Sequence, residues 1–199
     1  MSGKLFVISA PSGAGKTTLA EKVLEHLSSK YPIGRVVTYT SRVARQGEKN
    51  GQDYNFVSSQ EFEQKMKDGF FLEWSGEYGH YYGTPRHIVD DLAQGFSRIL
   101  IIDRLGARRI FEIAKDASPT LTNMVTSIWI FPPSISELEK RLVGRAKDTT
   151  KQIEKRLALA QKELQEENTN PLYDHTILND DFSEAMQKLE ALLICELEK

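Results

Sequence analysis

The sequence predicts an α/β protein with a five-stranded parallel sheet and flanking helices. Short apolar runs recur along the chain, amphipathic helical patterns separate most of them, and a glycine-rich loop follows the first run. The runs that we expect to form buried parallel strands are Leu5–Ile8, Val36–Tyr39, Ile99–Ile102, Ser127–Phe131 and His175–Leu178. This pattern does not predict the order of the strands in the sheet.

Two stretches between the strands carry apolar residues at helical spacing. Residues 19–27 form one stripe, and residues 135–142 form another. Ser134 and Glu137 stand at the spacing of a capping box at the start of the second stretch. The alternation of strand and helix places the first helix directly after the glycine-rich loop.

The alternation is interrupted between about residues 40 and 95. A strand-like run, Tyr54–Val57, is followed by a helix opening at Ser58, with Glu61 at the capping-box position. A second helix is expected to begin at Thr84–Pro85 and to end at Gly95. We therefore expect residues 40–95 to form a small α+β lobe inserted into the core.

A second, polar insertion lies near Gly144–Thr150 and runs into a long helix from Lys151 to Glu167. We expect residues 144–167 to form a short mobile lid with the helix that follows it. The remaining segments, 1–39, 96–143 and 168–199, then make up the core of a single domain.

Composition excludes several classes of protein. With 26 basic and 28 acidic residues the net charge is −2, which gives no long-range attraction for nucleic acid. No window is apolar and long enough for a membrane span, and we expect no membrane partner. The single cysteine, Cys195, excludes a disulfide within the chain and fits a cytoplasmic protein.

The glycine-rich loop has the spacing of a P-loop, the phosphate-binding motif of ATP- and GTP-dependent enzymes. Its residues are Ala10, Pro11, Ser12, Gly13, Ala14, Gly15, Lys16 and Thr17, with Ala10 in place of the usual first glycine, and we expect the ATP contacts to extend to Thr18. Glycines let backbone N–H groups turn toward phosphate oxygens, and the following helix points its positive end at the same place. Lys16 can bridge the transferred phosphate, and the Thr17 hydroxyl can bind Mg²⁺. The alternative is a glycine-rich turn with a surface lysine.

The residues after the P-loop resemble those of guanylate kinases, over almost the whole chain. The segments that carry the resemblance are 40–48, 50–56, 71–74, 81–84, 141–145 and 179–181. The resemblance implies that Arg42, Arg45, Tyr54 and Tyr82 hold the phosphate of GMP. It also implies that Thr38, Thr84 and Asp103 help to hold the base.

The chemistry of these residues agrees with such roles. Two arginines three positions apart can both reach a dianionic phosphate, and their planar forks suit its oxygens. Guanine presents two adjacent donors, N1–H and the 2-amino group, which a carboxylate matches. Glu73, within an apolar and aromatic segment, is the candidate. The alternatives are a solvated basic loop for the arginines and an exposed strand position for Glu73.

Asp103 comes directly after the run Ile99–Ile102, at the carboxyl end of a predicted strand, where ligands of open α/β sheets bind. It could orient a water molecule on Mg²⁺ or accept a hydrogen bond from guanine. Guanylate kinases usually carry a second acid two positions earlier and a glutamine before the following glycine. Ile101 and Leu105 stand at these positions here.

Three arginines follow later in the chain: Arg141, Arg145 and Arg156. In guanylate kinases, arginines here close over the phosphates from a mobile lid, and the resemblance implies a catalytic role for them beside Lys16. The alternative is an ordinary arginine on a helix surface. The phosphate of GMP is mostly dianionic at pH 7, so the transfer needs no general base. It does need charge neutralisation and alignment.

The resulting expectation is a guanylate kinase that transfers a phosphoryl group from MgATP to GMP. A sugar-phosphate kinase on the same scaffold would not need Glu73 and Thr38 to recognise a base. Non-catalytic guanylate-kinase-like modules usually lose the P-loop, whereas Lys16 and Thr17 are present here. The sequence does not separate GMP from dGMP as acceptor, and it does not indicate an oligomeric state.

Overall fold

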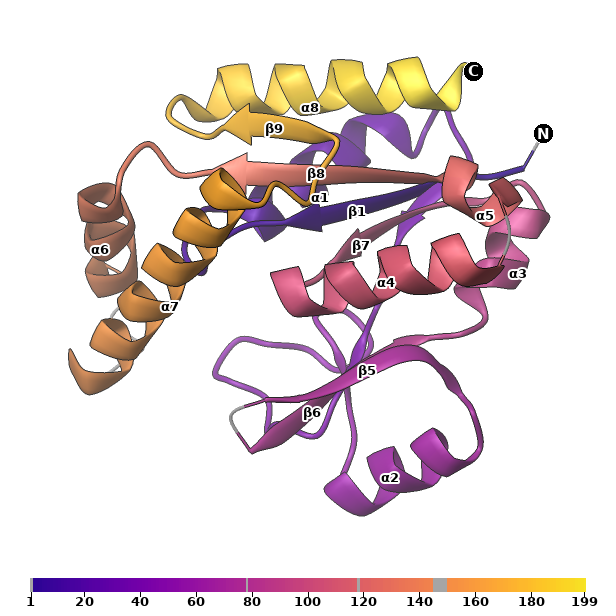
Figure 1. Ribbon diagram of the computed structural model, residues 1–199, viewed down its shortest axis with the longest axis horizontal. Helices are drawn as coiled ribbons and strands as arrows, with labels where there is room; N and C mark the ends of the chain where they lie inside the picture. Colours follow the sequence, from indigo (N-terminus) through magenta and orange to yellow (C-terminus); the bar gives the residue numbers. More distant parts are fainter. Residues whose placement is uncertain (1, 78, 118, 145–149) are drawn as a thin grey trace.

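Two separate β-sheets organise the chain (Figure 1). The computed structural model describes residues 2–77, 79–117, 119–144 and 150–199. The larger sheet has five parallel strands in the order β2-β7-β1-β8-β9, which confirms the predicted fold class. These strands are β1 (Leu5–Ser9), β2 (Ile33–Arg35), β7 (Ser97–Ile101), β8 (Val125–Phe131) and β9 (His175–Leu178).

The large sheet is covered on both faces, which explains why its strands are continuously apolar. Phe6 and Ile8 of β1 pack in the cluster that includes α1 (Lys16–Leu27) and α8 (Phe182–Leu197). Leu5 and Val7 point into the opposite cluster. That cluster includes residues of α3 (Ile88–Ala93) and α4 (Arg104–Ala117), while the short helix α5 (Pro119–Met124) precedes β8. β1 is therefore the centre of the core, and its carboxyl end is where the P-loop begins.

The smaller sheet forms a lobe below the large one in Figure 1, with strand order β4-β3-β6-β5. Its elements are β3 (Tyr39–Thr40), β4 (Asn55–Phe56), β5 (Phe71–Glu77), β6 (His80–Pro85) and the helix α2 (Ser59–Lys67). The capping box of Ser58 and Glu61 is present, as predicted, and such a cap stabilises a helix by about 1 kcal/mol. Phe62 of α2 stacks on Phe71 of β5, with ring centroids 4.4 Å apart, and fixes the helix on the sheet.

Helices α6 (Ile135–Gly144) and α7 (Thr150–Thr169) extend away from the sheet on one side of the molecule (Figure 1). The backbone N–H of Glu137 donates to Ser134 Oγ at 3.1 Å, as the predicted cap requires. Helix α7 is the long helix expected from Lys151 to Glu167. Among the described residues, no helix combines the length and apolar character that crossing a bilayer requires.

Two predicted elements differ from the structure. The run Val36–Tyr39 is not one core strand: β2 ends at Arg35, and Tyr39 already pairs in the small sheet. An apolar run reports burial but not the sheet in which a residue is buried. The helix expected from Thr84–Pro85 begins only at Ile88. Thr84 and Pro85 end β6, because Thr84 bonds to Glu73 and Pro85 pairs with Phe71.

Candidate active site

The P-loop lies between β1 and α1, as the sequence predicts. Gly13 and Gly15 have φ angles of 94° and 89°, which side-chain-bearing residues rarely adopt. A Cβ at Gly13 would lie 3.1 Å from Leu138 Cδ2, so α6 packs directly on the loop. Lys16 is the first residue of α1, and the positive end of that helix therefore faces the loop. The geometry is that of an anion site formed by backbone N–H groups.

Two side chains from distant segments contact this loop. Asn179, just after β9, donates through Nδ2 to the Ala14 carbonyl at 2.7 Å. Arg156 of α7 donates to Ser12 Oγ through Nε at 2.9 Å and through Nη2 at 2.6 Å. The structure thus places Arg156 at the P-loop, where the sequence expected it to act.

Of the other two arginines predicted to be catalytic, only Arg141 lies within the described residues. Arg141 of α6 pairs with Glu137 at 3.3 Å and donates to the Asn179 carbonyl at 3.5 Å, so it lies near the same loop. Arg145 lies outside the described residues.

A second group of side chains gathers on the small lobe. Arg42 donates through both Nη atoms to the carboxylate of Glu48, at 2.9 Å each. Its guanidinium lies over the rings of Tyr54 and Phe56, 5.5 and 5.6 Å from their centroids. Tyr82 contacts Tyr54 edge to face at 6.2 Å. Three of the four predicted phosphate ligands, Arg42, Tyr54 and Tyr82, are therefore together. Arg42 is held by a carboxylate that sequence reasoning had not singled out.

Glu48 also contacts Arg45, the fourth predicted phosphate ligand. The backbone N–H of Arg45 donates to Glu48 Oε2 at 2.7 Å, while the Arg45 residue is exposed. Although burial opposes ionisation, the hydrogen bonds from Arg42 and from this N–H keep the pKa of Glu48 below its usual value. Glu48 therefore stays charged and holds the Arg42 fork in one orientation. Its place in the quoted segment 40–48, three residues after Arg45, was the signal that could have found it.

Glu73 of β5 is a buried carboxylate, 8% exposed. Thr84 Oγ1 donates to its Oε1 at 2.6 Å across the β5–β6 pair. Burial raises the pKa of Glu73 to about 7, against the hydrogen bond from Thr84, and the negative charge of Asp103 adds to the rise. Glu73 is therefore not at an exposed strand position. A partner that donates two hydrogen bonds to this carboxylate would favour its ionised form.

Asp103 lies at the carboxyl end of β7 and accepts a hydrogen bond from the Gly106 N–H at 2.8 Å. A Cβ at Gly106 would lie 3.4 Å from Asp103 Oδ1 and 3.6 Å from Glu73 Oε2, so the two carboxylates flank the same glycine. Thr38 is buried, and its carbonyl accepts from the Asn55 N–H at 2.8 Å. The structure therefore groups Asp103 with Glu73, on the side of the expected base.

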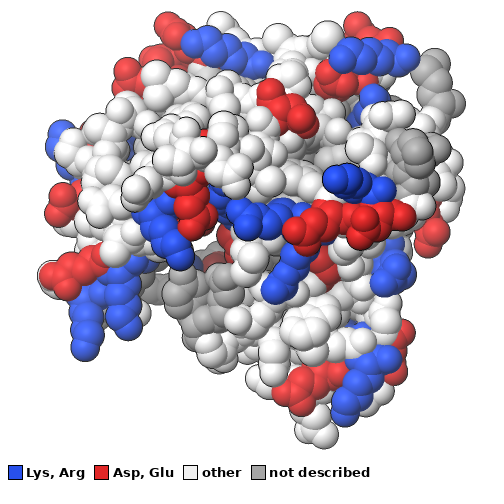
Figure 2. All heavy atoms as spheres, in the orientation of Figure 1, with Lys and Arg blue, Asp and Glu red and all other residues white. Residues whose placement is uncertain are grey.

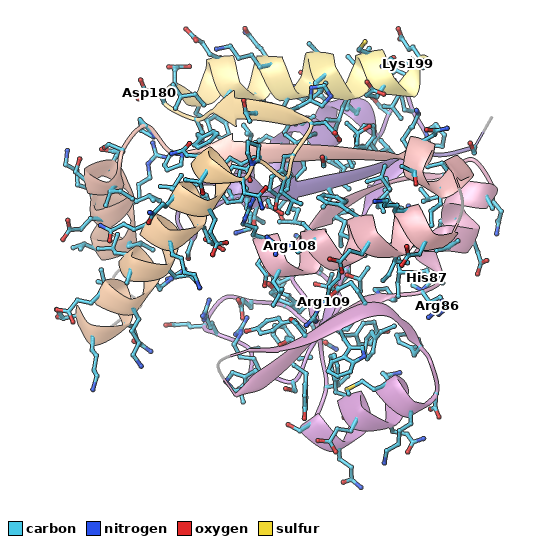
Figure 3. The ribbon with its side chains drawn as sticks, viewed as in Figure 1. Arg86, His87, Arg108, Arg109, Asp180 and Lys199 are labelled. Atoms are coloured by element: carbon cyan, nitrogen blue, oxygen red, sulfur yellow. The ribbon has the colours of Figure 1, made fainter. Side chains whose placement is uncertain are left out.

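Core and lobe also touch through Arg109 of α4, which the sequence did not indicate. Arg109 donates to the backbone carbonyl of Trp74 on β5, and in Figure 3 it lies between helix and strand. Its positive charge acts to lower the pKa of the neighbouring Glu73. Arg109 thus ties the strand that carries Glu73 to the core.

The comparison with known proteins adds an independent observation. The family model for guanylate kinase matches residues 2–196. The chain belongs to the guanylate kinase family. Its activity is therefore transfer of the γ-phosphoryl group of ATP to GMP, which gives ADP and GDP.

Individual relatives cover nearly the whole of this guanylate kinase. A guanylate kinase of Protochlamydia amoebophila is 40% identical over 98% of this chain and 91% of that protein. One of Dechloromonas aromatica is 39% identical over 97% of this chain and 89% of its own length. The crystal structure of guanylate kinase from Anaplasma phagocytophilum superposes with a TM-score of 0.76 at 32% identity, covering 100% of this chain and 88% of that one.

Proposed function

We propose that ATP binds at residues 10–18 and that GMP binds on the small lobe, so that transfer takes place between them. In this assignment residues 40–95 form the GMP-binding lobe, and residues 144–167 form the lid and the helix that follows it. The observation that carries the proposal is the buried carboxylate of Glu73, which lies in the same lobe as the Arg42 cluster. One end of GMP is an anion and the other end presents two donors, and this lobe offers a partner for each.

Recognition of the base falls to Glu73, with Thr38, Thr84 and Asp103 beside it. Guanine N1–H and its 2-amino group donate to the ionised carboxylate. Adenine would turn an unprotonated ring nitrogen toward it and leave a buried charge without a donor. Mismatches of this kind discriminate between substrates by about 10⁴.

The phosphate of GMP is assigned to Arg42, Arg45, Tyr54 and Tyr82. Glu48 and the rings of Tyr54 and Phe56 orient the Arg42 guanidinium before any ligand arrives. Less side-chain entropy is then lost when the phosphate binds. A phosphate oxygen of GMP is the nucleophile, and at pH 7 it is already largely deprotonated.

On the donor side, Lys16 neutralises charge on the transferred phosphoryl group, and Arg156 and Arg141 approach the P-loop from α7 and α6. Arg145 joins them in the proposal on the strength of its sequence position alone. All four cations oppose the negative charge that spreads over the phosphoryl oxygens in the transition state.

Mg²⁺ completes the proposed donor site. The available ligands are hard oxygens, which this ion prefers: the Thr17 hydroxyl in the first turn of α1 and, through water, Asp103. Residues 2–77, 79–117, 119–144 and 150–199 contain no cluster of three or more His, Cys, Asp or Glu residues that could enclose a metal. Mg²⁺ commonly keeps waters and substrate phosphates as ligands. When bound, the ion would neutralise negative charge on the phosphate groups.

We also propose that the enzyme is cytoplasmic and that its partners are small nucleotides. One cysteine in 199 residues suits a reducing cytoplasm. On the face in Figure 2 basic and acidic side chains are interspersed, which supports small nucleotides rather than nucleic acid as partners.

The test is a coupled assay with MgATP and each of GMP, dGMP, AMP, CMP and UMP. We expect GMP to be phosphorylated with a kcat/KM about 10³-fold or more above that of AMP, CMP and UMP. Glu73→Ala should lower kcat/KM for GMP much more than it lowers kcat/KM for AMP. Equal rates with all acceptors would refute base recognition by Glu73, and ATP hydrolysis without an acceptor would refute the assigned reaction.

A further inference from the structure

Three charged side chains are buried among the described residues: Glu73, Arg104 and Glu167. Glu73 belongs to the base site, whereas Arg104 and Glu167 pair with each other through Arg104 Nη1 and Glu167 Oε2. Burying two charges removes water from both, and this penalty offsets most of their attraction. A buried pair is therefore weak evidence for a gain in stability. Its location in the fold is the better indication of what it does.

The pair joins two segments that are 63 positions apart in the sequence. Arg104 is the first residue of α4 and directly follows Asp103, while Glu167 lies in the last turn of α7. Arg104 also donates through Nη2 to the Asn170 carbonyl at 2.7 Å. The Glu167 carboxylate accepts from the backbone N–H groups of Leu172, at 3.1 Å, and Tyr173, at 3.4 Å. The end of α7 and the chain that leaves it are thus fixed next to the strand end that carries Asp103.

Helix α7 has few other buried contacts. Of its 20 residues, only Ala160 and Glu167 are buried. Two buried points, Ala160 and Glu167, fix the direction of the helix axis. Without Glu167, only Ala160 and the partly buried Leu157 and Leu164 hold the helix on the core, so its axis can tilt. Arg156 lies four residues before Ala160, on the side of it away from Glu167 and about 6 Å along the helix axis. A tilt of about 10° around Ala160 therefore displaces Arg156 by about 1 Å. Misplacement by about 1 Å can lower a rate about 10²-fold.

We propose that Arg104 and Glu167 are positioning residues that anchor the base of α7 and so align Arg156 at the P-loop for phosphoryl transfer. The inference rests on the proposed role of Arg156 and adds to it a device outside the nucleotide sites. The positive charge of Arg104 also suits its position at the end of helix α7. The carbonyl end of a helix is negative, and Arg104 supplies the positive charge that the last turn of α7 lacks.

The decisive variant replaces both partners, Arg104→Met with Glu167→Met. Two apolar side chains of similar length avoid an unpaired buried charge and can leave a fold as stable as before. We expect a melting temperature close to that of the wild type, a kcat lower by about tenfold or more, and KM values for ATP and GMP within about threefold. Wild-type kcat in a folded double variant would overturn the inference.

Two further variants serve as controls for the double variant. Glu166 lies 3.4 Å from the same guanidinium but is 43% exposed, so Glu166→Gln is the matched control and should keep kcat within about twofold. Arg104→Lys keeps the charge and loses the planar fork. If the double variant does not fold, Arg104→Lys decides: we expect a lower kcat with unchanged KM, and an unchanged kcat would refute the alignment argument.

A double-mutant cycle with Arg156→Ala tests whether the pair acts through Arg156. In that background the two methionines should lower kcat by less than about twofold, because the group they misplace is absent. Losses that multiply would refute the inference and leave the role of Arg156 intact. An unchanged kcat for Arg156→Ala alone would refute the role itself, and the inference with it.

Discussion

The pKa of Glu73 leads to a prediction about how GMP binding depends on pH. Burial and the nearby Asp103 raise this pKa to about 7 in the free protein. In the proposed site, guanine donates two hydrogen bonds to Glu73 and so requires the ionised form. Below pH 7, binding must therefore first remove a proton from Glu73. Affinity should fall about tenfold per pH unit, which is about 30-fold, or about 2 kcal/mol, at pH 5.5.

The same shift predicts how the stability of the free protein depends on pH. A carboxyl with a raised pKa holds its proton more tightly in the folded than in the unfolded chain. Between the usual value of 4.5 and about 7, the folded state therefore binds more protons, and stability falls as pH rises. The loss attributable to Glu73 is about 3 kcal/mol. Glu73→Gln lacks this loss and should gain stability relative to the wild type as pH increases from 5 to 8.

The assay is titration calorimetry with GMP from pH 5.5 to 8, on the wild type and on Glu73→Gln. The amide should weaken binding at pH 8 by about 1–3 kcal/mol, because it offers a single acceptor atom to two donors. The phosphate of GMP itself titrates near pH 6 and does so with both proteins, so only the difference between them reports Glu73. Identical pH profiles for the two proteins would refute the assignment of Glu73 to the base.

Further predictions concern the anion-binding parts of the site. Lys16→Ala should lower kcat about 10²-fold or more and leave the Kd of GMP within about threefold, which calorimetry checks; lost GMP affinity in a folded variant would contradict the separation of the two sites. Gly15→Ala should lower stability by about 1–3 kcal/mol in thermal unfolding, because φ is 89° and the new Cβ would lie 2.7 Å from Asn179 Nδ2; an unchanged melting temperature would show that the loop can relax. Arg42→Lys should raise the KM for GMP about tenfold by losing the planar fork, with a matched Lys65→Arg exchange as control; an unchanged KM would remove Arg42 from the phosphate site. Arg145→Ala should lower kcat strongly and change the separate Kd values of ATP and GMP only modestly; binding lost in proportion to rate would make it a ground-state anchor.

Much of the fold could be predicted because the relevant signals are local. The strand–loop–helix around Gly13 and Gly15 depends on a short motif and on apolar periodicity, both of which are visible in consecutive residues. The Ser58 cap is likewise set by residues three apart. Glu73 could be singled out by its chemistry, although its burial and raised pKa depend on Thr84 and Asp103.

The sequence by itself determined the parallel α/β core, the position of the P-loop and the residue types that suit GMP. Tertiary structure alone decided the strand order, the transfer of the chain from the large sheet to the small one after Arg35, and the partners of the charged groups. Glu48 beside Arg42, Asn179 beside Ala14 and Glu167 beside Arg104 are such partners, and the last pair is separated by 63 positions. Periodicity and capping act over a few residues, whereas the pairing of distant charges depends on how whole elements pack, and packing is a property of the assembled fold.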